Sequence, residues 1–422
     1  MQEERKVRVL LVGANLNEQE YFEESFQELE GLAIACHMEV VGNIVQNLKE
    51  ISSSFYIGTG KVEEIREEAK ELGAEIIVFN NELSPMQLKN LEDKLDIPVI
   101  DRTGLILEIF SSRAKTKEAK LQVETARLQY MLPRLVGLNS YLSRQGGGSA
   151  FNNKGSGEKK LELDRRKIEE RLTELRKRLE ELQNTRENQR KQRKKSGLPQ
   201  VALVGYTNAG KSTIMNAILN YFDQPEEKQV LEQDMLFATL ETTIRNITLE
   251  DNKQFLLSDT VGFIRQLPHS LIKAFRSTLE EVKQADLLLH VIDYSDPNFM
   301  EQMKITKETL KEIGADEIPV IYVYNKSDLM LDKLPFRDED EIYISASQGR
   351  GIKELIEMIS EKIFSDYVNC QMLIPFDKGN IVSFLNEVAT VKKTQYLEQG
   401  TLLDLNCKLE YYHKYQEFVV TN

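Results

Sequence analysis

Short apolar runs alternate with amphipathic stretches over the first 112 residues of this 422-residue chain. The apolar runs have the length of buried strands and occupy residues 7–12, 33–41, 75–79 and 97–100. The amphipathic stretches predict helices at residues 18–29, 61–72 and 85–95. This alternation is typical of a parallel sheet covered by helices, so residues 1–112 are predicted to form an α/β domain.

Apolar residues at heptad spacing mark the next part of the chain, residues 113–197. One series steps by seven, four, three, four and three positions through Leu161, Ile168, Leu172, Leu175, Leu179 and Leu182. A preceding series has similar spacing through Ala114, Leu121, Leu128, Leu132 and Leu135. Two helices with matching apolar seams predict an antiparallel hairpin.

Glycine dominates the segment that joins these two helices, residues 144–157. It contains five glycines and one large apolar residue, Phe151, which is too little apolar surface for a core. We therefore expect a tip that is mobile in the free protein and becomes ordered on a partner, although a simple flexible connector has the same composition. Phe151, if exposed on such a loop, would be able to stack on a nucleobase.

The C-terminal half of the chain contains two further α/β patterns. Residues 198–365 alternate buried strands with helices around a mostly parallel sheet, and residues 366–422 predict a small α+β domain. In the small domain we expect a helix at 381–389 and strands near 395, 402–409 and 418–420.

A glycine-rich loop follows the apolar strand at 201–204 and has the spacing GxxxxGKS. In such a loop successive backbone N–H groups surround the α and β phosphates, Lys211 reaches the β and γ phosphates, and the Ser212 hydroxyl ligates Mg²⁺. The sequence therefore predicts a nucleoside triphosphatase. The predicted nucleotide-binding residues of the loop are Gly205, Tyr206, Thr207, Asn208, Ala209, Gly210, Lys211, Ser212 and Thr213.

Three further motifs follow in the order that this class of site requires. The first is DxxG at Asp259, Thr260, Val261 and Gly262, in which Asp259 would hold Mg²⁺ through water and the Gly262 N–H would meet the γ-phosphate. The second is NKxD, whose carboxylate can accept both N–H groups of the guanine edge, at Asn325, Lys326 and Asp328. The third ends a strand and would bring backbone to the base, at Ser345, Ala346 and Ser347. These motifs predict GTP and GDP as ligands, with Mg²⁺.

Two features of the segments around DxxG bear on hydrolysis. A threonine that meets Mg²⁺ only in the triphosphate state is needed between the phosphate loop and DxxG, and spacing leaves the choice open among Thr239, Thr242 and Thr243. Many related GTPases have a glutamine directly after DxxG, but this chain has Phe263. An aromatic ring cannot accept a proton from the attacking water, so we predict slow intrinsic hydrolysis that a partner stimulates.

Several segments together resemble the HflX family of ribosome-associated GTPases. They are GYTNAGKST, LFATL, DTVGFIRQLPHSLIKAFRSTLEE and, upstream, IGTGKVEEI, FNNELSP, DRTGLILEIFSSRA, LQVETARLQYMLPRL and GEKKLELDRR. The resemblance covers roughly residues 6–365. Two segments depart from the family pattern: LETT stands where the family has LDPTT, and the glycine-rich tip is about two residues longer than the family's GGIGTRGPGE.

The resemblance adds expectations that the residues alone do not supply. It implies that Thr239 joins Ser212 as a Mg²⁺ ligand and that the neighbouring Phe237 and Ala238 belong to the nucleotide site. The catalytic group is then expected to be Lys211, Thr239, Asp259 and Gly262. The resemblance also implies that the hairpin enters the peptidyl-transferase region of the large ribosomal subunit.

Composition limits the compartment and the class of protein. No apolar run approaches the roughly 20 residues of a membrane helix, and the charged N-terminus does not resemble a signal peptide. Three scattered cysteines without a CxxC pair are typical of a reducing cytoplasm and argue against a structural zinc site. We expect a cytoplasmic monomer that does not bind membranes.

Charge is distributed unevenly along the chain. The net charge is −13, but residues 158–195 contain 15 basic and 9 acidic residues, a local net of +6. A solvated basic helix face would explain this local positive charge. The resemblance favours the interpretation that the basic residues contact RNA phosphates. We hypothesise a GTPase that binds the large subunit and separates stalled or idle ribosomes. The alternatives are a large-subunit assembly GTPase, or an RNA-binding module that hydrolyses almost no GTP.

Overall fold

The computed structural model describes residues 5–17, 19–144, 154–195, 197–222, 236–237, 242–250, 253–265 and 281–420, with side chains outside 136–161 and 188–196. The chain divides into two compact units. The first comprises Met1–Leu182, Gln233–Leu240 and Arg265–Arg276, and the second comprises the remainder. Among the described residues, no helix combines the length and apolar character needed to span a bilayer.

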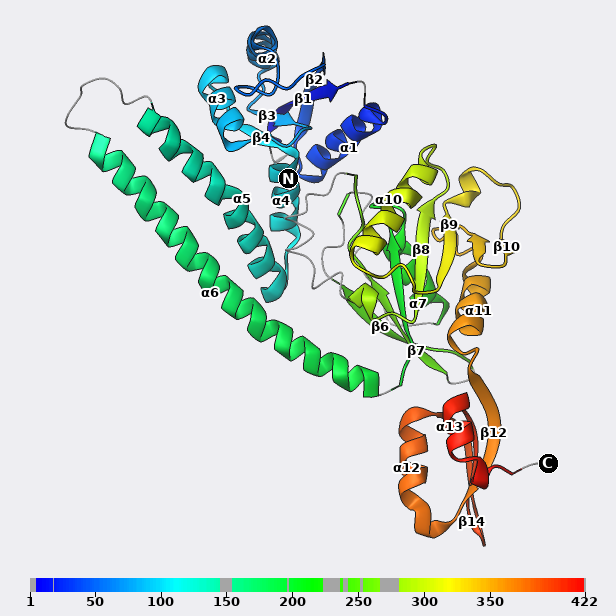
Figure 1. Cartoon of the computed structure of the whole chain (residues 1–422). Helices are drawn as coiled ribbons and strands as arrows, with labels where there is room; N and C mark the ends of the chain where they lie inside the picture. Colours follow the sequence, from blue (N-terminus) through cyan, green and yellow to red (C-terminus); the bar gives the residue numbers. More distant parts are fainter. Residues whose placement is uncertain are drawn as a thin grey trace. The chain divides into compact units, whose positions relative to one another are not determined.

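The N-terminal domain contains a four-stranded parallel sheet in the order β2-β1-β3-β4 (Figure 1). Its strands are β1 (Arg8–Leu16), β2 (Glu39–Leu48), β3 (Ile76–Phe79) and β4 (Val99–Asp101). Its helices are α1 (Phe22–Ala35), α2 (Thr59–Leu72), α3 (Pro85–Leu95) and α4 (Arg102–Arg113). The predicted α/β class is confirmed, and α4 is an element that the apolar pattern did not identify.

One predicted boundary in this domain is wrong. We expected a strand at 33–41, but α1 continues through Ala35 and β2 begins at Glu39. Leu29, Leu32 and Ala33 are all buried, which continues the helical repeat past the predicted end. An apolar run of this length does not by itself distinguish a buried helix end from a strand.

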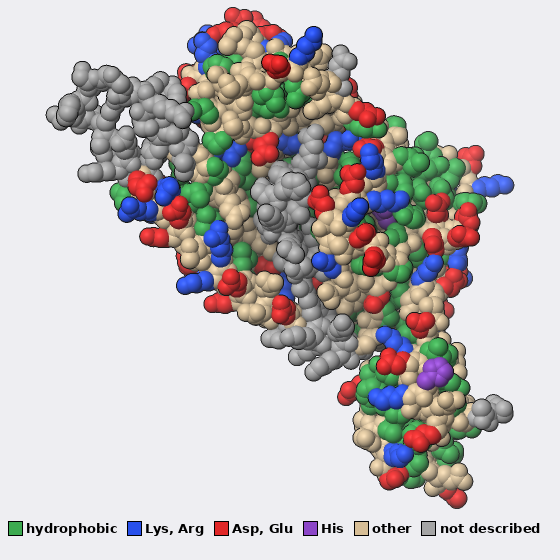
Figure 2. Space-filling view, in the orientation of Figure 1, with side chains coloured by type: hydrophobic (Ala, Val, Ile, Leu, Met, Phe, Trp, Pro, Cys, Tyr) green, Lys and Arg blue, Asp and Glu red, His purple; other side chains and the backbone are tan. Residues whose placement is uncertain are grey.

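The helical hairpin consists of α5 (Lys117–Arg144) and α6 (Lys154–Lys195) (Figure 1). Arg171 of α6 forms a two-point ion pair with Glu124 of α5, with Nε–Oε1 and Nη2–Oε2 distances of 2.7 and 3.0 Å. The exposed part of α6 presents charged side chains of both signs (Figure 2). Gly155 and Gly157 lie within α6, which corrects their assignment to the tip, and 145–153 lies outside the described residues.

A buried carboxylate attaches α5 to the N-terminal domain. Asp101, at the end of β4, is completely buried and accepts hydrogen bonds from the Tyr130 hydroxyl at 2.6 Å and from Arg134 at 2.9 Å. It also accepts from the backbone N–H groups of Leu83 and Gly104. A buried charge with this many donors is satisfied, so Asp101 fixes the end of β4, the start of α4 and the middle of α5 together.

The GTPase domain is built on a seven-stranded sheet in the order β10-β11-β9-β8-β5-β7-β6 (Figure 1). The strands are β5 (Gln200–Gly205), β6 (Thr243–Thr248), β7 (Gln254–Asp259), β8 (Leu287–Asp293), β9 (Val320–Asn325), β10 (Phe336–Asp338) and β11 (Glu341–Tyr343). The flanking helices are α7 (Lys211–Tyr221), α10 (Phe299–Glu312) and α11 (Ile352–Ile363), with the 3₁₀ turn η2 (Ser327–Leu329). Only the outermost strands β6 and β10 pair antiparallel to their neighbours, so the predicted mostly parallel sheet is confirmed.

The C-terminal domain has a three-stranded antiparallel sheet in the order β12-β14-β13. Its elements are β12 (Tyr367–Ile374), η3 (Phe376–Lys378), α12 (Gly379–Val388), β13 (Thr390–Leu397), β14 (Gly400–Lys408), α13 (Leu409–Lys414) and η4 (Gln416–Phe418). The predicted α+β class is confirmed, but the strand expected at 418–420 is wrong. Phe418 lies in the turn η4, and the segment forms only a bridge from Val419 to Met372, because the turn interrupts the extended backbone.

Candidate nucleotide-binding site

The glycine-rich loop lies at the carboxyl end of β5 and at the N-terminus of α7. Gly205 and Gly210 have φ angles of 145° and 93°, which L side chains rarely adopt. A Cβ at Gly205 would lie 2.2 Å from the Val291 carbonyl oxygen, and one at Gly210 would lie 2.2 Å from Asn325 Nδ2. The glycines are therefore required both by backbone conformation and by close packing. The N-terminus of α7 is the end of a helix that favours phosphate.

Lys211 is a buried cation at this helix end. Its ammonium donates to the carbonyl oxygens of Gly205 and Tyr206, at 3.2 and 2.7 Å. Burial lowers its pKa from 10.5 to about 8, and the charge of Asp259 opposes that shift. The Thr207 hydroxyl in the same loop is buried and has no hydrogen-bond partner among the residues that the structure describes. A buried ammonium and a buried hydroxyl of this kind fit the oxygens of a phosphate group.

Two oxygen ligands suited to Mg²⁺ meet beside the loop. The Ser212 hydroxyl donates to Oδ2 of Asp259 at 2.7 Å, and Asp259 is completely buried at the end of β7. Hydroxyl and carboxylate oxygens are ligands that Mg²⁺ prefers. The third expected participant, Thr239, lies outside the described residues, as does Ala238. Thr243 is fixed in β6, directly opposite Asp259 in the strand register.

Backbone after DxxG pairs with the glycine-rich loop. The Thr207 N–H donates to the Phe263 carbonyl at 2.8 Å, and the Phe263 N–H donates to the Gly205 carbonyl at 3.1 Å. A Cβ at Gly262 would lie 2.8 Å from the Thr207 Cα and 2.9 Å from the Lys211 ammonium. Gly262 thus lies directly against the loop, and the Phe263 side chain is 2% exposed. The Phe263 ring has no group that accepts a proton from water, and slow intrinsic hydrolysis stays a prediction.

Three segments of the predicted nucleotide site meet at Asn325. Its Oδ1 accepts from the Ala346 N–H at 3.0 Å, and its Nδ2 donates to the Ala209 carbonyl at 3.0 Å. The side chain of one asparagine therefore joins the NKxD segment, the Ser345–Ser347 segment and the phosphate loop. Ser345 and Ser347 lie with their hydroxyl oxygens 3.4 Å apart.

Two residues of the base region were not selected from the sequence. Asp293, at the end of β8, forms an ion pair of 2.7 Å with Lys326, whose φ of 59° lies in the left-handed region. Gln348 donates from Nε2 to Oδ2 of Asp328 at 2.9 Å. A sequence pattern could have identified Asp293, since it ends an apolar strand as Asn325 does. In the structure Asp293 and Asn325 are register partners on β8 and β9. No sequence pattern distinguishes Gln348.

Models of known families match four consecutive stretches of the chain. Their descriptions are GTP-binding GTPase N-terminal over residues 23–111, GTP-binding GTPase Middle Region over 113–193, 50S ribosome-binding GTPase over 200–326 and HflX C-terminal domain over 331–413. A protein called GTPase HflX from Caldanaerobacter subterraneus subsp. tengcongensis is 44% identical over 94% of this chain and 91% of its own length. The chain belongs to the HflX family of GTPases.

A second HflX relative gives the same result. GTPase HflX of Escherichia coli is 40% identical over 90% of this chain and 88% of its own length. A crystal structure of a GTP-binding protein from Sulfolobus solfataricus in complex with GDP has 24% identity, covers 86% of this chain and 99% of its own, and superposes with a TM-score of 0.45. The family resemblance is confirmed, and it extends beyond residue 365 into the C-terminal domain. The chain is a GTP-hydrolysing enzyme of the HflX family.

Helix α4 of this HflX GTPase contacts two segments that adjoin nucleotide motifs. The Phe237 ring, two residues before Thr239, is 2% exposed and packs edge-on against Phe110 with centroids 4.8 Å apart. The family resemblance assigned Phe237 to the nucleotide site. In the structure its ring packs within the first unit. At the other end of α4, Arg102 donates to the backbone carbonyl of Arg265, three residues after Gly262.

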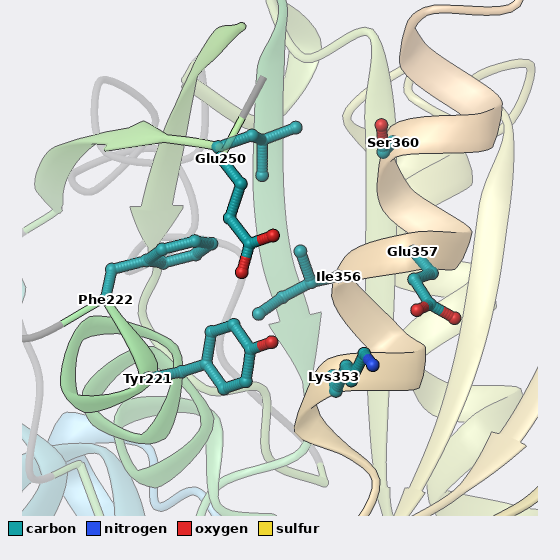
Figure 3. A pocket seen from close by; sticks show the side chains of 8 residues that line it. Tyr221, Phe222, Glu250, Lys353, Ile356, Glu357 and Ser360 are labelled. Carbon is teal, nitrogen blue, oxygen red and sulfur yellow. The ribbon is translucent and has the colours of Figure 1, made fainter. Parts of the chain in front are cut away.

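A separate pocket of about 320 Å³ lies at the opposite end of α7 from the phosphate loop (Figure 3). Tyr221 and Phe222 line it at the end of α7, with Glu250 between β6 and β7. Side chains of α11, including Ile356 and Glu357, form its other wall. It contains none of the predicted nucleotide-binding residues.

Proposed function

We propose that GTP and Mg²⁺ bind at the junction of the glycine-rich loop, Asp259 and the NKxD segment. The observation that carries the proposal is the buried Lys211 ammonium, whose hydrogen bonds to described residues go to the carbonyl groups of Gly205 and Tyr206 in its own loop. Phosphate oxygens would give this desolvated cation an anionic partner. Ser212 and Thr239 would ligate Mg²⁺, Asp259 would hold the ion through water, and the bound ion would neutralise developing charge on the phosphates.

The NKxD segment would select the base. The Asp328 carboxylate would accept the two N–H groups of the guanine edge in place of its present bond to Gln348. Asn325 would act indirectly, since its two hydrogen bonds hold the Ala209 and Ala346 backbones at a fixed separation. A GTP-binding titration with the Asn325→Ala variant tests this role, because the Ala209 and Ala346 segments would both lose their hydrogen bond to Asn325. We expect weaker GTP binding.

We further propose that the enzyme binds the large ribosomal subunit in its GTP state and separates stalled or idle ribosomes. Three features support this proposal: the match to the model described as 50S ribosome-binding GTPase, the two long helices α5 and α6, and the basic sequence over 186–195. The hairpin would reach ribosomal RNA near the peptidyl-transferase centre. Contacts with RNA phosphates would supply much of the affinity.

Sucrose-gradient sedimentation tests ribosome separation directly. Purified protein and GTP are added to intact ribosomes, with GDP and the Lys211→Ala variant as matched controls. We expect free subunits with GTP and intact ribosomes with both controls. An enzyme that binds only immature large subunits and leaves mature ribosomes intact would be an assembly factor, and that result would reject the proposal. Phosphate release with and without ribosomes measures the stimulation.

The cellular setting is part of the same proposal. We place the enzyme in the cytoplasm as a monomer, in keeping with the absence of a membrane-spanning helix from the described residues and with scattered cysteines. Cell fractionation and light scattering of the purified protein measure these two properties.

A further inference from the structure

Two cysteines of the C-terminal domain lie side by side on adjacent strands. Cys370 of β12 and Cys407 of β14 have sulfur atoms 3.9 Å apart. In the antiparallel register Cys407 pairs with Val368, so the two cysteines are diagonal neighbours on the same face. Two thiols at this distance can form a weak S–H···S hydrogen bond.

The two thiols have different surroundings. Cys407 is completely buried in the domain core with Leu403 and Leu405. Cys370 is half-buried and lines a surface cavity of about 380 Å³ together with Asp404, Tyr412 and Val420. Cys370 is therefore the more exposed of the two residues, and Cys407 is shielded from solvent.

The hydrogen bond between the thiols also makes them chemically unequal. A hydrogen bond from Cys407 lowers the pKa of Cys370, although burial and the charge of Asp404 oppose this effect. The same bond and burial raise the pKa of Cys407. Because the thiolate is the nucleophile, Cys370 is the sulfur that reacts first.

We propose that Cys370 is a reversible oxidation site for hydroperoxides and that Cys407 resolves the oxidised product into an intramolecular disulfide. The Cys370 thiolate attacks the peroxide oxygen and forms a sulfenic acid, releasing water or an alcohol after one proton is taken up. Cys407 then attacks the Cys370 sulfur, and the sulfenic oxygen leaves as water with the thiol proton. The two thiols together lose two electrons, which reduce the peroxide.

The strand geometry makes this disulfide easily reducible. Diagonal neighbours in an antiparallel pair have Cα atoms about 7–8 Å apart, whereas a relaxed disulfide needs less than about 7 Å. Bond formation therefore requires a local shift of the β12 backbone relative to β14. This movement is feasible because β12 is an edge strand, held on its outer side by the Met372–Val419 bridge and by the bond from Val420 to Gln371. Strained disulfides are reduced readily, so the site returns to the dithiol form.

Cys36 provides a control within the same chain. Its thiol donates to the Leu105 carbonyl, and burial raises its pKa to about 12. Among the described residues, its thiol bonds to no second cysteine. It should therefore be inert under conditions that oxidise Cys370.

The test uses the reduced full-length protein, treated with a few equivalents of hydrogen peroxide, alkylated and mapped by mass spectrometry. We expect a two-hydrogen mass loss, located at Cys370 and Cys407 and reversed by dithiothreitol. The Cys36→Ser variant should behave like the parent. Cys407→Ser should accumulate a sulfenic acid on Cys370 that dimedone traps, and Cys370→Ser should leave Cys407 unoxidised.

Two results would overturn the inference: alkylation of Cys370 as complete after peroxide as before, or oxidation of Cys407 in the Cys370→Ser variant. Unchanged circular dichroism and thermal unfolding of the reduced cysteine variants show that they are folded. The outcome does not depend on ribosome binding, so its failure and failure of the proposed function are distinguishable.

Discussion

The guanidinium group of Arg102 donates a hydrogen bond from Nη2 to the backbone carbonyl of Arg265, at 3.1 Å. The same side chain forms an ion pair with Glu28 and donates to Asn80 and to the Ser25 carbonyl. Arg102 begins α4 and is 2% exposed, whereas Arg265 lies three residues beyond Gly262. A buried arginine therefore holds one backbone carbonyl, three residues after Gly262, within the first unit.

Replacement of Arg102 should destabilise the first unit strongly. Arg102→Ala leaves the Glu28 carboxylate without its ion-pair partner, and breaking a buried pair in this way costs about 3–5 kcal/mol. The matched control is Arg127→Ala, since Arg127 and Glu108 form an exposed pair worth about 1 kcal/mol or less. Urea unfolding followed by circular dichroism measures both variants. Equal losses in the two variants would contradict the importance of burial.

Nucleotide binding should be coupled to proton uptake through Lys211. Its pKa of about 8 in the free protein should rise when anionic phosphates surround it. At pH 8 binding should then take up about half a proton, and less at pH 7, where the lysine is already charged. Calorimetric titration with GDP in buffers of different ionisation enthalpy measures this uptake. Identical heats in all buffers at pH 8 would refute the coupling.

The same pKa shift predicts a pH dependence of stability without nucleotide. The folded protein holds the Lys211 proton less tightly than the unfolded chain, where the pKa is 10.5. The unfolded chain thus binds more protons between about pH 8 and 10.5, and the free energy of unfolding should rise with pH through this window. Comparison with Lys211→Met, which lacks the titrating group, isolates the effect. Parallel stability curves for the two proteins would exclude it.

Asp328 should determine the base. Asp328→Asn should weaken GTP binding and favour xanthosine triphosphate, because an amide N–H suits a carbonyl where guanine has an amine. Gln348→Ala is the control, since it removes the present partner of Asp328 and should leave the preference for guanine intact. Fluorescent-nucleotide competition measures both preferences. Unchanged GTP affinity in Asp328→Asn would reject the assignment.

Thr239 should act only in the triphosphate state. Thr239→Ala should impair ribosome-stimulated hydrolysis and leave GDP affinity nearly unchanged, whereas Ser212→Asn should abolish hydrolysis. Thr243→Ala is a useful comparison because Thr243 is held in β6. Stimulated phosphate release measures all three variants. Normal turnover in Thr239→Ala would move the role to Thr242 or Thr243.

Different parts of the hairpin should serve ribosome binding and subunit separation. Neutralising Arg190, Lys191, Arg193, Lys194 and Lys195 should weaken ribosome binding and reduce its salt dependence, by somewhat less than one unit of slope for each lost phosphate contact. Deleting 147–152 preserves α6, which begins at Lys154, and should reduce affinity only modestly while abolishing subunit separation. Pelleting assays at several salt concentrations and sucrose gradients measure the two properties. Subunit separation at the parent rate by the deletion variant would disprove the role of the tip.

The nucleotide motifs, the fold class and the two hairpin helices were predictable from the order of residues alone. These depend on local chemistry: Gly205 and Gly210 are required by backbone conformation at their own positions, and a heptad seam is visible within one helix. Predictions from the same local patterns were wrong at the end of α1 and at the start of α6. At both positions packing and helix continuation outweigh the preferences of single residues.

Contacts between residues far apart in the chain were not predictable and were found in the folded protein. The pairing of Asp293 with Lys326 depends on β8 lying beside β9, and the contact of Cys370 with Cys407 depends on the register of β12 against β14. The bond from Arg102 to Arg265 joins positions 163 residues apart. No periodicity encodes such pairs, because sheet order and register are set by the burial of whole elements, which then brings these side chains together.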